Sequence, residues 1–130
     1  MSYIIYDSRL IKTLECLKDL AAFAGKDDNF VDKLWSGLSE NAELMNEFIY
    51  YLENHTFKDK YKIHGYGLTD LYFFNMRNFE IKQDLGKDYG AGNKESLALD
   101  TFMMMIEMKS DPDRYLKWLD QGPGMDRFFD

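Results

Sequence analysis

Residues 94–109, KESLALDTFMMMIEMK, have the periodicity of a helix that is apolar on almost every side. Its polar residues are confined to a narrow stripe through Ser96, Asp100 and Glu107. A helix in contact with water needs a polar face, and one that is apolar all round lies in the interior of a protein. This segment therefore belongs either in the middle of a helical bundle or at an interface between subunits.

Most of the remaining chain carries apolar residues at steps of three and four, the spacing of amphipathic helices. Ser39 is the expected N-cap of the third helix, and Asp111 followed by Pro112 is expected to open the last one. Besides the segment described above, the pattern predicts helices over residues 7–25, 29–39, 40–55, 69–84 and 110–122.

Residues 56–67, TFKDKYKIHGYG, interrupt the helical pattern. Their apolar side chains alternate weakly with lysines, so one short extended segment or a loop is expected near residues 57–64. A chain of this length can bury a core without a disulfide or a metal. The prediction is an all-α fold, a compact bundle of five to six helices that forms a single domain over residues 1–130.

The charge balance narrows the class of partner. The chain has 130 residues and a formal net charge of −7, from 16 basic and 23 acidic side chains. A nucleic-acid-binding protein neutralises phosphates with lysine and arginine, so this balance argues against nucleic acid as the partner. A protein partner with a basic surface suits the charge better.

Cysteine content and hydrophobicity bear on location. Cys16 is the only cysteine, which excludes an intrachain disulfide and fits a reducing compartment. The opening MSYIIYDSRL is too short for a secretion signal and lacks its basic start, and no apolar run approaches the roughly 18 residues of a membrane span. The expectation is a cytoplasmic protein without a membrane span.

The most glycine-rich stretch is DLGKDYGAGNKES, residues 84–96. It is not a Walker A phosphate loop, because Asn93 separates Gly92 from Lys94 and because the stretch follows a helix instead of a strand. Two interpretations stay open. In one, the stretch connects two helices and Asn93 is an ordinary N-cap. In the other, Asn93 also caps the following helix, and Lys87, Asn93 and Lys94 bind an anion at the N-terminus of that helix.

Two pairs of carboxylates form a second candidate site. Glu40 and Glu43 share one face of a helix with Glu47, and Glu80 and Asp84 share a face of another helix. If the two pairs faced each other, their oxygens would suit Mg²⁺ or Mn²⁺. The other interpretation is a solvated acidic face that binds no metal.

The Glu40–Glu43 spacing, E-x-x-E, resembles the first half of the metal-binding motif of all-α nucleotide pyrophosphatases. The second half, E-x-x-D, does not occur downstream. One hypothesis for the function is therefore a metal-dependent enzyme acting on nucleotides or nucleic-acid phosphates. In that enzyme Asp100 would add a metal ligand, and Lys87 and Lys94 would contact phosphate.

The preferred hypothesis is a protein-binding module, regulatory or accessory, that is not an enzyme and needs no cofactor. Aromatic and methionine side chains are abundant, and the apolar end of the chain, with Met125, Phe128 and Phe129, needs a surface to cover it. Apolar surface in excess of what a monomer can bury predicts a homodimer, most simply a two-fold one.

Overall fold

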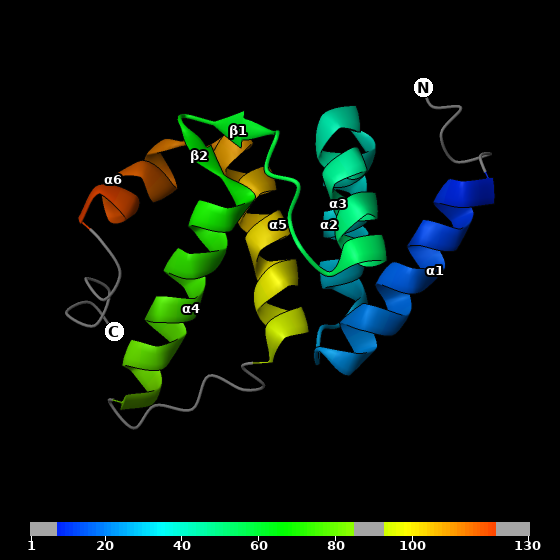
Figure 1. The fold of residues 1–130 in the computed structure, drawn as a ribbon, viewed down its shortest axis with the longest axis horizontal. Helices are drawn as coiled ribbons and strands as arrows, with labels where there is room; N and C mark the ends of the chain where they lie inside the picture. The colour runs from blue at the N-terminus through cyan, green and yellow to red at the C-terminus, as the bar shows by residue number, and fades with distance from the viewer. Residues whose placement is uncertain (1–7, 85–92, 122–130) are drawn as a thin grey trace.

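The prediction of an all-α bundle with one short extended segment is confirmed by a computed structural model, which describes residues 8–84 and 93–121. The central apolar segment is helix α5, which lies between α4 on one side and α2 and α3 on the other (Figure 1). In chain order the elements are α1 Ser8–Phe23, α2 Asp28–Ser39, α3 Ala42–Asn54, β1 Lys62–Ile63, β2 Tyr66–Gly67, α4 Leu68–Asp84, α5 Lys94–Ser110 and α6 Asp113–Gln121.

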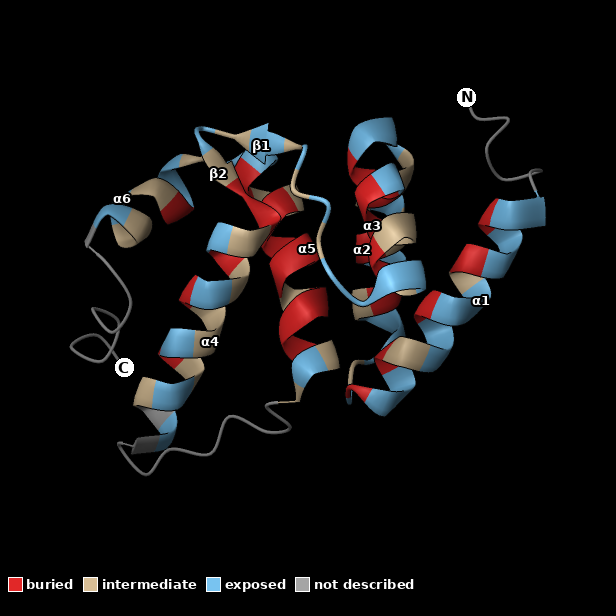
Figure 2. Cartoon of the chain, in the orientation of Figure 1, coloured by how far each residue is buried: buried red, intermediate tan, exposed pale blue. Residues whose placement is uncertain are grey.

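Helix α5 is the centre of the core, and Figure 2 shows it buried along most of its length. It contacts α1, α2, α4 and α6. The sequence allowed this helix to lie in the middle of the bundle or at an interface between subunits, and the structure places it in the middle of the bundle. The side chains of α5 that are wholly shielded from solvent are Ala98, Leu99, Thr101, Phe102, Met105 and Met108.

Helix α3 begins later than expected. Ser39 is not its N-cap, because α2 continues through Ser39 and α3 starts at Ala42. Asn41 caps α3 instead: its side-chain oxygen accepts a hydrogen bond from the Leu44 N–H at 3.1 Å. Asparagine and serine cap helices by the same mechanism, so the periodicity alone could not choose between positions two residues apart.

The extended segment is a β-hairpin in which each strand and the turn between them have two residues. Strand β1 pairs with β2 in antiparallel register, with Lys62 opposite Gly67 and Ile63 opposite Tyr66. The two residues between the strands, His64 and Gly65, have positive φ angles of 50° and 85°. Positive φ at both central positions is the geometry that lets a two-residue turn follow the natural twist of a hairpin.

Glu47 is buried, which corrects the expectation that it shares a solvated face with Glu40 and Glu43. Only 3% of Glu47 is exposed. Its carboxylate accepts hydrogen bonds from three successive backbone N–H groups of the segment that follows α3, those of Asp59, Lys60 and Tyr61, at 2.8–2.9 Å. One buried anion thereby satisfies three backbone donors and holds this segment against α3.

The same segment caps α4. Gly67, just before the helix, donates its N–H to the Asp70 carboxylate at 2.9 Å, which is half of a capping box. A serine or threonine at Gly67 would normally supply the other half, but a Cβ there would collide with the side chain of Asp59. Asp59 replaces it, accepting from the Thr69 N–H at 3.2 Å. The start of α4 therefore depends on a residue ten positions upstream.

Glu107 joins three helices. From α5 it accepts a hydrogen bond from Lys33 of α2 at 2.8 Å and another from the Tyr115 hydroxyl of α6, and Arg114 lies 3.9 Å away. Burial alone would raise the pKa of Glu107, but the hydrogen bonds from Lys33 and Tyr115 and the nearby positive charges outweigh it and lower the pKa below 4.5. Folding therefore favours the ionised form.

Because of Glu107 and its partners, the free energy of unfolding should depend on pH in the acid range. Because the folded pKa of Glu107 is lowered, its stabilising contribution is complete above the unfolded value near 4.5 and is lost as the pH falls through the folded pKa. At pH 7 we expect Glu107→Gln to lower the free energy of unfolding by about 1 kcal/mol. Urea denaturation at pH 7, 5, 4 and 3 should show this difference shrinking below about pH 4.5. A difference that stays constant down to pH 3 would contradict the prediction.

Within residues 8–84 and 93–121, none of the helices combines the length and the hydrophobicity that a membrane crossing requires.

Candidate functional site

A pocket of 170 Å³ opens where the end of α3, the segment after it and the first turns of α4 meet the start of α5. Four of its eight lining residues are phenylalanine or tyrosine, and the others are polar. Its lining consists of Tyr51, His55, Thr56, Phe57, Thr69, Tyr72, Phe73 and Lys94.

The rings of the pocket form a continuous aromatic wall. Tyr51 and Phe57 are stacked, with centroids 5.3 Å apart and planes inclined by 19°. Phe57 is 5.4 Å from Tyr72, and Tyr72 meets Phe73 edge-on at 6.0 Å. Phe102 of the core lies behind this wall, 5.8 Å from Phe57. The wall is thus anchored on the buried face of α5, while Phe73 at its outer end is 55% exposed.

The local backbone explains how Phe57 reaches the pocket. His55 ends α3 in the left-handed conformation, with φ at 57°, and its N–H donates to the Tyr51 carbonyl at 2.7 Å. This cap reverses the chain so that Phe57 stacks on Tyr51 of the preceding helix. The three hydrogen bonds to Glu47 then hold the following residues.

The two tyrosines of the pocket remain protonated at neutral pH. Burial, followed by the negative charge of Glu95 and the neighbouring Tyr72, raises the pKa of Tyr51 to about 12. Burial and Glu95 also raise the pKa of Tyr72. Both hydroxyls therefore keep a proton that they can donate, and Lys94 at the exposed rim can only donate.

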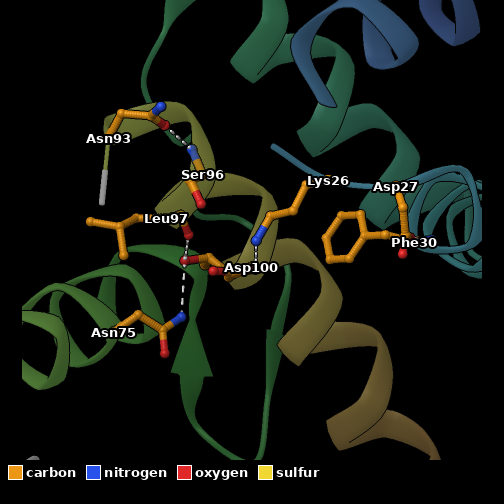
Figure 3. Close-up of polar contacts among 9 residues, drawn as sticks. Lys26, Asp27, Phe30, Asn75, Asn93, Ser96, Leu97 and Asp100 are labelled. Atoms are coloured by element: carbon orange, nitrogen blue, oxygen red, sulfur yellow. Dashed lines mark hydrogen bonds and ion pairs between the residues drawn. The ribbon is translucent and has the colours of Figure 1, made fainter. Parts of the chain in front are cut away.

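Two residues of the predicted anion site, Asn93 and Lys94, lie at the start of α5. Asn93 is the N-cap of α5, a role that both interpretations gave it, because its side-chain oxygen accepts from the Ser96 N–H at 2.6 Å (Figure 3). Lys94 lines the aromatic pocket. Lys87 lies outside the described residues, as do Met125, Phe128 and Phe129 at the end of the chain.

The two carboxylate pairs are not brought together. Glu40 and Glu43 lie where α2 ends and α3 begins, whereas Glu80 and Asp84 lie in the last turns of α4, at the opposite end of the bundle (Figure 1). Asp100 forms an ion pair with Lys26 at 2.6 Å instead (Figure 3). Among the described residues, no three acidic, histidine or cysteine side chains form a group that could hold a metal ion.

Two other hollows of 250 Å³ have a different character. One lies between α1 and α3 and includes Cys16, which is exposed. The other lies where α2 ends beside the last turns of α5 and includes Glu40. None of the described residues that line these two hollows is aromatic. The aromatic pocket therefore differs from both in offering ring faces to a ligand.

Comparisons with models of protein families, with curated proteins and with solved structures found no match for this chain.

Proposed function

We propose that this chain is a protein-binding module, regulatory or accessory in role, and that the aromatic pocket receives one bulky side chain of its partner. The size of the pocket supports this proposal. Its 170 Å³ is below the roughly 300–1,000 Å³ of sites for drug-sized ligands. A cavity of about 150 Å³ is known to hold one benzene molecule, so the space suits a single ring.

The construction of the pocket also supports binding of an anchor side chain. Residues that dominate the binding energy of protein interfaces are often aromatic, and they enter well-packed pockets from which water is excluded. Tyr51 and Phe57 are held by the core and by the Glu47 hydrogen bonds, so little conformational freedom remains to be lost on binding. Phe73 is exposed and would be covered by the partner.

The proposal predicts that peptide binding depends on Phe73. Peptides selected from a random library displayed on phage should bind at least about tenfold more weakly to the Phe73→Ala variant. Phe23→Ala is the matched control, since Phe23 is 68% exposed on α1, away from the pocket. Fluorescence anisotropy would measure both affinities. Selected peptides that bind the Phe73→Ala variant as tightly as the parent protein would rule out the pocket as the recognition site.

We further propose that the module is a cytoplasmic homodimer. Helix α5 lies inside the bundle, so it no longer argues for an interface between subunits. Ile11 of α1 is a large apolar side chain that is 50% exposed and would suit one. Sedimentation equilibrium should then give twice the chain mass of 15.4 kDa.

The hypothesis of a metal-dependent phosphate-processing enzyme gains no support from the separated carboxylates.

A further inference from the structure

We infer that the anchor side chain is aromatic and that an acidic residue of the partner lies directly beside it and pairs with Lys94. This inference rests on the proposed function, and it concerns the chemistry of the same pocket. The aromatic wall supports an aromatic anchor. Aromatic side chains favour stacked and edge-on contacts with one another, and both geometries occur within the wall: Tyr51 and Phe57 are stacked, and Tyr72 meets Phe73 edge-on.

The polar residues of the lining support an acidic residue beside the anchor side chain. Lys94 is exposed and carries a positive charge, and His55 and Thr56 are also exposed at the rim. The hydroxyls of Tyr51 and Tyr72 carry a proton at neutral pH, as tyrosines ordinarily do, and burial raises the pKa of both further. Among the described residues that line the pocket, none carries a carboxylate. A lining that supplies hydrogen-bond donors and one fixed cation is complementary to a carboxylate beside the anchor ring.

Glu95 is the negative group that opposes this preference. It follows Lys94 in α5, is half-buried and does not line the pocket, but its charge acts on Tyr51 and Tyr72. Lys94 and Glu95 should therefore influence an acidic peptide in opposite directions, the first attracting it and the second repelling it. Opposite effects of Lys94 and Glu95 on the affinity for an acidic peptide would not arise from non-specific binding to the pocket.

The net charge of −7 does not prevent a local contact with an acid. At physiological ionic strength the Debye length is about 8 Å, so charges on distant parts of the surface are largely screened. A carboxylate held beside the Lys94 ammonium interacts mainly with the groups at the rim. The overall charge can still favour a partner that is basic elsewhere on its surface.

Three peptides test the inference. Each is a short glycine–serine peptide with one central phenylalanine, which is followed by two aspartates, two asparagines or two lysines. Two-dimensional NMR titration of the full chain would measure their dissociation constants. We expect the aspartate peptide to bind about two- to fivefold more tightly than the asparagine peptide, which is the range of an exposed ion pair, and the lysine peptide to bind most weakly.

Charge variants complete the experiment. Lys94→Gln should remove the preference for aspartate, and Glu95→Gln should increase it. Lys18→Gln is the matched control, because Lys18 is an exposed residue of α1 and its loss changes the net charge by the same amount as the loss of Lys94. It should leave the order of the three peptides unchanged.

The outcomes separate the inference from the proposed function. Equal binding of the three phenylalanine peptides, still weakened by Phe73→Ala, would overturn the acidic preference and leave the pocket as a protein-binding site. A preference for aspartate that survives Lys94→Gln would overturn the role of Lys94. Binding that Phe73→Ala does not weaken would overturn the proposed function itself.

Discussion

Replacing Phe102 by alanine is expected to lower the free energy of unfolding by about 4 kcal/mol. Phe102 is wholly buried in the middle of α5. Its ring lies edge-on to Phe48, with centroids 5.0 Å apart, and 5.8 Å and 6.0 Å from the rings of Phe57 and Tyr51. Alanine would remove the apolar surface that these rings cover and leave a cavity between α3 and α5. Urea denaturation followed by circular dichroism would measure the loss.

Two variants control for the loss of an aromatic ring as such. Phe73→Ala removes the same atoms from a side chain that is 55% exposed, so it should cost about 1 kcal/mol or less. Phe102→Leu keeps most of the buried volume and should cost about 1.5 kcal/mol. If Phe102→Ala costs no more than Phe73→Ala, Phe102 does not occupy the centre of the core.

The Phe102→Ala variant also connects the core to the pocket. Phe57 packs against Phe102 of the core and is stacked on Tyr51, which also packs against Phe102. A cavity behind Phe57 allows this ring to move inward, which would disturb the wall even in molecules that remain folded. We therefore expect the variant to bind pocket-dependent peptides more weakly than the change in its folded fraction explains.

The helical architecture could be predicted because it depends on local patterns. The central position of α5 follows from the narrowness of its polar stripe, which leaves too little polar surface for a helix that faces water. Asn93 could be recognised as an N-cap because capping needs only one side chain and a backbone N–H three residues later. Such signals lie within one or two turns of the chain.

The burial of Glu47 could not be predicted in this way. Glu40, Glu43 and Glu47 repeat at steps of three and four, the pattern of an acidic face in water. Only Glu47 is covered, because residues 59–61 fold back over it and direct three N–H groups at its carboxylate. The decisive contact joins residues 12 to 14 positions apart and leaves no mark on the periodicity of α3.

The aromatic pocket escaped the sequence analysis for a related reason. Its wall is assembled from Tyr51, Phe57 and Tyr72, which belong to three separate segments, and each of them alone resembles a core residue. Lys94 was singled out, but as part of an anion site with Lys87. A local signal was available in Phe57, an aromatic residue in a stretch that breaks the helical pattern, but Tyr61 and Tyr66 of the same stretch give the same signal.

The contact that holds the pocket wall gives the second large prediction. Glu47→Ala is expected to lower the free energy of unfolding by about 3 kcal/mol, because hydrogen bonds to a charged group contribute about 1.5–3 kcal/mol each and water can replace part of the loss. For a chain of this size the melting temperature should fall by roughly 10 °C. Thermal unfolding followed by circular dichroism would measure the shift. Glu43→Ala is the matched control, one turn earlier on α3 and exposed, and should cost less than about 1 kcal/mol.

The glutamine variant distinguishes the charge of Glu47 from its shape. Glu47→Gln keeps one acceptor oxygen but directs an amide N–H₂ toward a backbone donor, so it should recover no more than about half of the loss. Because Asp59 also caps α4, release of its backbone should increase hydrogen exchange at the first amides of α4, including that of Thr69. Glu47→Ala should therefore weaken peptide binding as well as stability, since Phe57 and the start of α4 both contribute to the pocket. Unchanged exchange at Thr69 in this variant would mean that the segment after α3 is held by its aromatic contacts alone.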